Sequence, residues 1–509
     1  MSEIINVNRI AKNTILLYVR MLLIMVVSLY TARIVLKVLG VEDFGINNVV
    51  AGVVAMFGFF NSAMSMATQR FLNVEMGRND PENLNRTFNM AVNIHAIVAL
   101  IVLVLSETVG VYLVNNVLNI PEYRMVAANW IFQFAIIGAC ITVIQVPYNS
   151  LIYAREKMNV YAYISIVEAV LKLLLVLLLA IINWDKLILY GFLTVAVHLL
   201  VFLFYFFYTK KNFQESKYSL IWNGEIFKKM IGFMGWNIFG QIAMVGTTQG
   251  VNMIVNVFHG VLLNAAMAVT NQVNNAITSF VNNFQTSFRP QIMKSYAANE
   301  IAEMNGLVIK SSKMSFYLLY LISVPLMFNI DFVLDIWLDI VPEYSGIFCK
   351  LLIWYTYLEA IGLPLVMSIM ATGRNRNYQI VISVIISLNL LLTWLFLKHG
   401  LRVEVVFYVR IAVSLVGLFV RMIFARKQAE MKITSFLTGS LKPVFLVLLI
   451  TQPCYYLLHH FYNMGGLWFW LLLTVVLEMI IAVVIYYFGM TINERLFVNE
   501  SILRFLKKK

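Results

Sequence analysis

Long apolar runs recur along almost the whole chain, and this feature constrains its fold more than any other. A bilayer core of about 30 Å is crossed by a helix of about 20 apolar residues. Windows of that length predict about fourteen spans. They lie near residues 13–36, 45–67, 88–112, 125–147, 160–182, 187–208, 230–257, 261–285, 314–334, 346–371, 378–397, 403–424, 441–460 and 466–489. The runs at 230–257 and 261–285 are the most polar of the set.

Composition agrees with these runs. The 509 residues are 61% hydrophobic and 12% charged, whereas a soluble domain is roughly 45–50% apolar and about 25% charged. The polar stretch at 1–12 is followed by an apolar run too long for a cleavable signal peptide, so we expect this run to remain as a span. The chain is therefore predicted to be an all-α integral membrane protein.

Basic residues are divided unequally between the connections. Lys and Arg concentrate in cytoplasmic loops and at the cytoplasmic ends of spans. With the N-terminus inside, most of the 38 Lys and Arg residues fall in inner connections. The outer connections hold only Lys37, Arg124, Lys186, Lys398 and Arg402. This distribution predicts that both termini are cytoplasmic, and it assigns the net charge of +13 to topology rather than to nucleic-acid binding.

A weak internal repeat suggests how the helices are grouped. Gly40 and Gly260 are 220 residues apart, and Arg70 and Arg289, which end the second and eighth runs, are 219 apart. Transporters are often built from two related bundles with the substrate site between them. We therefore expect two six-helix lobes, 1–208 and 209–424, around a central cavity. Two additional helices and a basic tail would occupy 425–509.

The N-terminal 90 residues resemble a known family. The stretches 13–20 (NTILLYVR), 31–36 (TARIVL), 39–45 (LGVEDFG), 68–71 (TQRF) and 77–78 (GR) are similar to the opening of Wzx-type flippases. These are polysaccharide-biosynthesis members of the multidrug/oligosaccharidyl-lipid/polysaccharide (MOP) exporter superfamily. The resemblance implies alternating access by two lobes. It also implies a substrate of isoprenoid pyrophosphate carrying an oligosaccharide, moved from the cytoplasmic to the outer leaflet.

The same resemblance implies a setting for the protein. It would be a multi-pass protein of the bacterial inner membrane that serves lipopolysaccharide, O-antigen or capsular polysaccharide biosynthesis. Its partners would be the lipid-linked oligosaccharide, membrane lipids and other polysaccharide-assembly proteins.

Basic side chains within spans are candidates for binding the pyrophosphate. An ionisable group at a helix centre costs about 2.5–3.5 kcal/mol on insertion scales, so it is a functional candidate by default. Arg20, Arg33 and Lys172 are the candidates for substrate binding within the spans. Arg20 is the first choice for the cavity, with a structural salt bridge as the alternative. Arg33 lies near the outer end, where it can also snorkel or cap, and Lys172 can instead pair with Glu168 one turn earlier.

Other basic residues have stronger structural alternatives. Arg70 and Arg289 close inner helix ends, where they would meet the incoming pyrophosphate or simply anchor the topology. Lys350 lies near an outer end, and Arg410 is expected to pair with Glu478 and tie the additional helices to the second lobe.

The eighth run carries a polar face. Its amide and hydroxyl residues recur at helical spacing, and they are Asn264, Asn271, Asn275, Thr278, Asn282 and Gln285. Such a face cannot meet lipid, because unpaired amides are too costly there. Asn271, Asn275, Thr278 and Asn282 are predicted to bind sugar hydroxyls in a wet cavity, with helix–helix hydrogen bonding as the alternative.

Other functions have little support in the sequence. No metal-ligand cluster, nucleotide-binding loop or nucleophile motif occurs, so we expect neither an enzyme nor a metal or other cofactor. Coupling to Na⁺ or H⁺ is left open, with Glu168 and Glu359 as the ion-coupling candidates. The alternatives are a cation-coupled multidrug exporter of the same superfamily and a lipid II flippase. From a different class, the alternative is a membrane-embedded polysaccharide polymerase or ligase.

Overall fold

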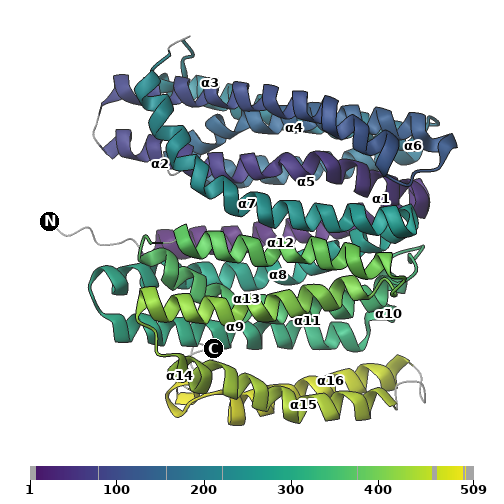
Figure 1. Ribbon diagram of the computed structural model, residues 1–509, viewed down its shortest axis with the longest axis vertical. Coiled ribbons are helices and arrows are strands. Elements are labelled where there is room, and N and C mark those ends of the chain that lie inside the picture. The colour runs from purple at the N-terminus through teal and green to yellow at the C-terminus, as the bar shows by residue number, and fades with distance from the viewer. Residues whose placement is uncertain are drawn as a thin grey trace. The chain divides into compact units, whose positions relative to one another are not determined.

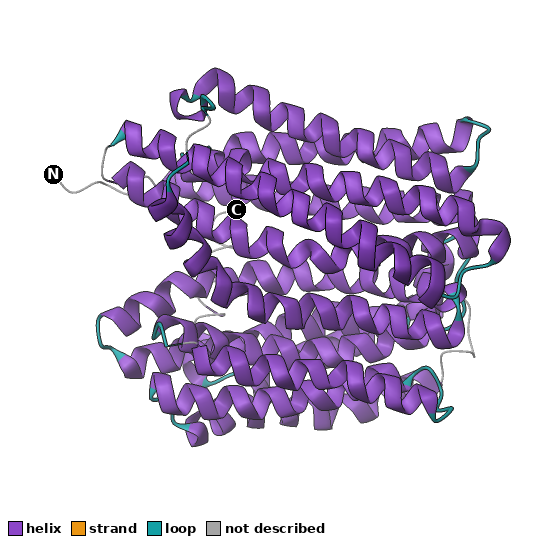
Figure 2. Ribbon diagram, turned by 45° about the horizontal axis from the view of Figure 1, so that its top comes forward, coloured by secondary structure: helices purple, strands orange, loops and turns teal. Residues whose placement is uncertain are grey.

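The computed structural model is built from helices joined by short connections (Figures 1 and 2). It describes residues 7–77, 80–155, 157–219, 222–374, 376–460, 467–496 and 499, and no strand occurs among them. The principal helices are α1 (Val7–Ala55), α2 (Phe59–Gly77), α3 (Pro81–Leu105), α4 (Met125–Ala154), α5 (Met158–Ile181), α6 (Lys186–Asn212), α7 (Gly224–His259), α8 (Val261–Ala297), α9 (Ile301–Phe328), α10 (Ile330–Trp337), α11 (Ser345–Ala371), α12 (Arg376–Lys398), α13 (Val405–Ala429), α14 (Ile433–Phe436), α15 (Lys442–His460) and α16 (Leu467–Val484).

The prediction of an all-α membrane protein is confirmed. Over the described residues, 11 helical segments are long and apolar enough to cross a bilayer. The predicted runs at 230–257 and 261–285 lie in α7 and α8, which are helical but more polar than these segments. The run at 45–67 is divided between the end of α1 and α2.

Polar residues in the connections begin several helices. Asp80 caps α3 by accepting a hydrogen bond from the Asn83 amide at 3.0 Å, and Pro81 follows at the first helical position. Asp185 caps α6 through the amides of Leu187 and Ile188 at 3.0 and 3.1 Å. These caps satisfy backbone donors that the first helical turn leaves free.

The chain forms two compact units. Unit 1 comprises residues 1–272, 335–345 and 383–406, and unit 2 comprises 273–334, 346–382 and 407–509. All five boundaries between them fall inside helices, in α8, α10, α11, α12 and α13. The predicted grouping into six-helix lobes at 1–208 and 209–424 and a terminal pair at 425–509 stays a prediction.

Unit 1 has a core of aliphatic and aromatic side chains. Helices α1, α3, α4, α5 and α6 lie side by side within it (Figure 1). The Tyr148 ring on α4 contacts the rings of Phe88, Phe202 and Phe206 with centroids 5.5, 5.8 and 5.4 Å apart. Because lipid tails are as apolar as these side chains, close packing and interhelical hydrogen bonds stabilise the bundle more than the hydrophobic effect does.

Unit 2 has its own aromatic core. The Phe316 and Tyr320 rings of α9 are stacked with centroids 5.3 Å apart, and Tyr357 of α11 packs edge-on against Phe316. The Tyr357 hydroxyl shares a 2.6 Å hydrogen bond with Ser323. Helices α15 and α16 pack against α9 in the same unit. The polar ends of these rings are therefore paired inside the bundle, as membrane burial requires.

Candidate functional site

Two glycines interrupt the helices at the positions that the internal repeat singled out. Gly40 divides α1 with φ 77° and ψ 170°, and Gly260 separates α7 from α8 with φ 74° and ψ −173°. This backbone region is accessible essentially only to glycine. The shared conformation supports the proposed correspondence between the first two and the seventh and eighth predicted spans.

A network of buried asparagines joins α1, α7 and α8 next to these breaks. The Asn264 amide donates to the Asn252 side-chain oxygen at 2.8 Å, and Asn256 donates to the Asn264 oxygen at 2.8 Å. Asn48 of α1 donates to the Asn264 carbonyl at 2.9 Å, and the Asn119 amide donates to Asn256 at 2.7 Å. Asn264, the first residue of the α8 polar face, therefore holds helices together, and its side chain is unavailable to a substrate.

The remaining members of that face differ from Asn264. Asn271 is half-buried, Asn275 and Asn282 are exposed, and no hydrogen bond joins their side chains to the part of the chain that the structure describes. The half-buried Thr278 hydroxyl donates to the Asn274 carbonyl at 2.8 Å. Amides at a helix surface need water or a polar ligand, because hydrocarbon offers them no partner. The middle of α8 thus presents available donors and acceptors.

The two ends of this face are occupied differently. Gln285 is buried and donates to the Ala360 carbonyl of α11 at 2.9 Å, so it serves helix packing. Arg289, one turn later, is exposed. An exposed guanidinium beyond a polar helix face remains available to an anion.

The predicted cationic residues are not brought together into one described cluster. The side chains of Arg20 and Arg70 lie outside the described residues. Arg33 binds Asp339 at 2.6 Å, and Lys37 binds the same carboxylate. These two hydrogen bonds, from Lys37 and Arg33, hold the pKa of Asp339 below its ordinary value.

Lys172 and Lys350 are also paired within their units. Lys172 on α5 binds Glu168 at 2.6 Å, as its sequence alternative predicted, so Glu168 already has a cationic partner. Lys350 on α11 lies 3.5 Å from Asp331. Neither pair is buried, and each makes only a modest contribution to stability.

Glu359, an ion-coupling candidate, belongs to a buried cluster in unit 2. One oxygen accepts from Ser414 at 2.6 Å and the other from Arg421 at 2.9 Å. The Arg421 side chain is only 7% exposed, so it is a fixed counter-ion inside the bundle. The sequence pattern did not single out Arg421 for this role. Because Glu359 and Arg421 are 62 positions apart in the chain, no local pattern indicated that they are in contact.

The prediction that Arg410 pairs with Glu478 is wrong. The Arg410 guanidinium lies over the Tyr355 ring, 4.3 Å from its centroid. Glu478 has a buried Oε2 with no hydrogen-bond partner among the described residues. The cation–π contact satisfies Arg410 within α11 and α13, because a ring face attracts a desolvated cation.

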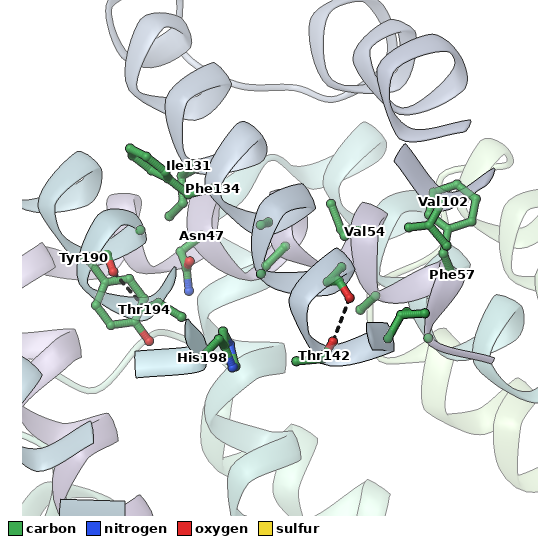
Figure 3. A pocket seen from close by; sticks show the side chains of 18 residues that line it. Asn47, Val54, Phe57, Val102, Ile131, Phe134, Thr142, Tyr190, Thr194 and His198 are labelled. Carbon is green, nitrogen blue, oxygen red and sulfur yellow. Dashed lines mark hydrogen bonds between the residues drawn. The ribbon is translucent and has the colours of Figure 1, made fainter. Parts of the chain in front are cut away.

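Unit 1 contains a cavity of about 370 Å³ between α1, α3, α4 and α6 (Figure 3). Its polar lining side chains are all neutral: Asn47, Thr142, Tyr190, Thr194 and His198. The other lining residues are apolar or glycine. A site without a carboxylate favours a neutral ligand over a cation. The sequence did hold a signal for it, since Tyr190, Thr194 and His198 recur every fourth residue on α6.

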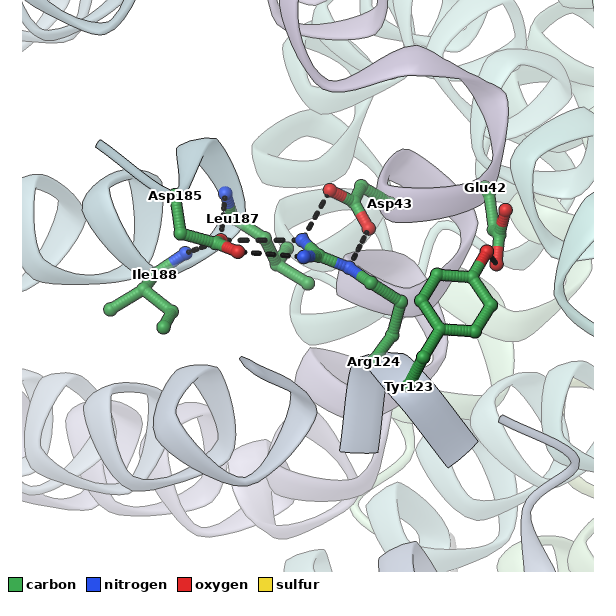
Figure 4. Close-up of polar contacts among 7 residues, drawn as sticks. All are labelled: Glu42, Asp43, Tyr123, Arg124, Asp185, Leu187 and Ile188. Atoms are coloured by element: carbon green, nitrogen blue, oxygen red, sulfur yellow. Dashed lines mark hydrogen bonds and ion pairs between the residues drawn. The ribbon is translucent and has the colours of Figure 1, made fainter. Parts of the chain in front are cut away.

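An ionic cluster joins α1 to two connections of unit 1, the one before α4 and the one before α6 (Figure 4). Arg124 binds Asp43 through two nitrogens, with Nε at 2.8 Å, and reaches Asp185 at 2.6 Å. The Tyr123 hydroxyl donates to Glu42 at 2.5 Å. Burial raises the pKa of Asp185, but the hydrogen bonds from Arg124 and the α6 backbone outweigh it and hold that pKa low. The predicted outer residue Arg124 thus fastens one end of the bundle.

Comparison with known proteins identifies the fold. The sequence matches no family model and no curated protein. A solved structure of the lipid II flippase MurJ, in an inward closed conformation, is 13% identical and superposes with a TM-score of 0.68 over 94% of this chain and 99% of that one.

Multidrug transporters superpose as well. An inward-facing multidrug resistance MATE family transporter of the MOP superfamily is 13% identical, with a TM-score of 0.60 over 79% of this chain and 94% of that one. The MATE multidrug transporter DinF-BH is 13% identical, with a TM-score of 0.64 over 85% and 98%. The chain therefore has the fold of the MOP-superfamily transporters, and the finer resemblance to Wzx-type flippases remains an expectation.

Proposed function

We propose that this protein is a flippase that moves an isoprenoid-pyrophosphate-linked oligosaccharide from the cytoplasmic to the outer leaflet. The extent of the structural match carries this proposal. The lipid II flippase aligns with 94% of the chain, whereas the two multidrug transporters align with 79% and 85%. Nearly the whole chain thus has a counterpart in a transporter whose cargo is a lipid.

The polar surface of α8 supports a sugar-bearing cargo. Asn271, Asn275 and Asn282 can each donate and accept hydrogen bonds, which is what sugar hydroxyls require. They lie on one face of a helix, and no described side chain uses their amides. We propose that this face lines the route of the oligosaccharide, while Asn264 and Gln285 hold the helix in place.

The pyrophosphate needs fixed cations in place of its hydration shell. Arginine binds such oxygens through two parallel hydrogen bonds. Arg289 is exposed beyond the polar face and is the best-supported contact for the incoming anion. Arg20 and Arg70 remain candidates on sequence grounds, whereas Arg33 and Lys172 would have to leave Asp339 and Glu168 before they could bind substrate.

The multidrug exporter is the second candidate, because MATE transporters share the fold. A cationic drug would favour acidic groups in its site. The unit 1 cavity is lined by neutral polar side chains, and Glu359 is already neutralised by Arg421. These observations favour the lipid cargo. A lipid II flippase would need the same fixed cations to bind its pyrophosphate. The transporter fold offers no support for a polymerase or ligase.

The proposal is tested by deleting the gene and measuring surface polysaccharide and lipid-linked intermediates. We expect surface polysaccharide to be lost and the glycolipid to accumulate on the inner leaflet. The wild-type gene should restore export, Arg289→Lys should restore it partly, and Arg289→Ala should fail. Arg86→Ala is the matched control, since Arg86 is a surface residue paired with Glu82. Normal surface polysaccharide without trapped glycolipid would overturn the proposal.

A further inference from the structure

Glu478 occupies an unusual place in α16. It is the only charged residue between positions 467 and 489, a segment that is otherwise apolar or aromatic except for Thr474. The span that contains it has a mean hydropathy of 2.5. A carboxylate near the centre of such a helix is costly and marks a functional site by default.

The Glu478 carboxyl has no counter-ion among the residues that the structure describes. Its Oε2 is buried, and neither a hydrogen bond nor an ion pair joins its side chain to the described part of unit 2. The buried cations of this unit are bound elsewhere, since Lys313 pairs with Glu494 and Arg421 with Glu359. Arg410 lies over Tyr355.

A neutral tyrosine interacts with Glu478. Helices α9 and α15 pack against α16, and among the described residues Tyr320 of α9 interacts electrostatically with the Glu478 carboxyl and with Cys454 of α15. The Tyr320 hydroxyl shares a 2.6 Å hydrogen bond with Thr451 and accepts from Gln452 at 3.2 Å. Because the Thr451 hydroxyl donates to the Val447 carbonyl at 2.7 Å, the Tyr320 hydroxyl is the donor to Thr451, and it must turn away from Thr451 to donate to the carboxyl.

Burial without a counter-ion strongly disfavours the carboxylate and favours the neutral acid. Glu359 offers the contrast within the same unit, because it accepts hydrogen bonds from both Arg421 and Ser414. We propose that Glu478 is a proton-binding site of the transport cycle. Its carboxyl holds the proton while Oε2 is buried, and it releases the proton when water reaches it. The Tyr320 hydroxyl, turned away from Thr451, then donates to the carboxylate.

This inference goes beyond the proposed cargo and moves the ion-coupling role away from Glu168 and Glu359. Both of those carboxylates already have a cationic partner. A bound proton needs no further ligand, whereas Na⁺ would require several oxygen ligands around Glu478. The structure supports a single carboxyl next to one hydroxyl chain.

Infrared spectroscopy of the full-length protein in lipid nanodiscs tests the site without any substrate. Wild type and Glu359→Gln should both show the carbonyl band of a protonated carboxylic acid, and Glu478→Gln should lack it. Between about pH 5 and about pH 9, the band should lose most of its intensity as the acid ionises. A band that survives in Glu478→Gln, or one that does not change with pH, would overturn the proposal.

A second measurement on the wild type guards against misfolding of the variant. Dicyclohexylcarbodiimide adds to protonated carboxyl groups in membranes, and mass spectrometry locates the adduct. We expect modification of Glu478 that slows as the pH rises, with Glu359 unmodified. Modification of Glu359 in place of Glu478 would contradict the assignment. Because neither experiment uses a glycolipid, their outcome is independent of whether the cargo proposed above is correct.

Discussion

The buried Lys313–Glu494 pair is expected to hold the segment after α16 against α9. Lys313 is 1% exposed, and its Nζ lies 2.7 Å from Oε2 of Glu494. Glu494 also accepts a 2.7 Å hydrogen bond from the Thr491 amide. Removing the carboxylate by Glu494→Gln would leave a buried ammonium group without a counter-ion. Such a change costs about 3–5 kcal/mol of unfolding free energy.

Two further variants distinguish the cost of leaving one buried charge unpaired from the contribution that the intact pair makes to stability. Lys313→Met leaves a carboxylate that is 13% exposed and still accepts a hydrogen bond from Thr491. This variant should therefore lose less unfolding free energy, about 1–3 kcal/mol. The double variant removes both charges and should regain most of the stability, because replacing a buried pair by apolar groups is often neutral.

The stability that the Lys313–Glu494 pair contributes should depend on pH. Burial raises the pKa of Glu494, but the hydrogen bonds from Lys313 and Thr491 outweigh it and place the pKa below its ordinary value of 4.5. The pair therefore contributes its stability above that pH and loses it as the pH falls through the lowered pKa. The difference between wild type and Glu494→Gln should shrink in acid.

The assay is unfolding by sodium dodecyl sulfate in mixed micelles, followed by tryptophan fluorescence. The reasoning would be refuted if Glu494→Gln stayed within about 0.5 kcal/mol of wild type, the usual range for surface changes. It would also be refuted if the double variant lost the sum of the two single losses, because groups in contact should not be additive.

Further predictions concern the helix breaks and the polar face of α8. Gly40→Ala and Gly260→Ala should each lower the unfolding free energy by about 1–3 kcal/mol, because both positions use backbone angles essentially restricted to glycine. Gly246→Ala, inside α7 with open space around it, should instead be neutral or slightly stabilising, and equal losses at all three positions would contradict this explanation. Asn264→Leu should cost about 1–3 kcal/mol for each amide it leaves unpaired, measured in the same micelles. Asn282→Ala should leave stability unchanged and reduce export of surface polysaccharide; the reverse pattern would mean that the roles of the two residues are exchanged.

The fold followed from the sequence to a large extent because a bilayer imposes simple rules. Each of the 11 apolar segments overlaps a predicted run. Even the polar helices α7 and α8 were anticipated, since their position was required by the alternation of basic connections. Gly40 and Gly260 were singled out by spacing alone, and their common backbone conformation gives that spacing a physical cause.

The site could be predicted only in part, because hydropathy does not show which helix each face contacts. Asn264 and Asn271 are both amides on one helix face, yet one is buried in a network and the other is half-buried without a partner among the described side chains. Arg421 lies within the predicted run 403–424 but was not singled out, although it pairs with Glu359 inside the bundle. Such contacts depend on how distant helices pack, which no local pattern records.

We propose that this protein carries an anionic, sugar-bearing lipid outward. The decisive measurement reconstitutes the purified protein into liposomes that contain an isoprenoid-pyrophosphate-linked oligosaccharide and follows the exposure of the glycan to an external lectin. We expect exposure to increase only with the protein present, Arg289→Ala to slow it, and a cationic dye not to be transported. Transport of the dye without movement of the glycolipid would overturn the proposed function.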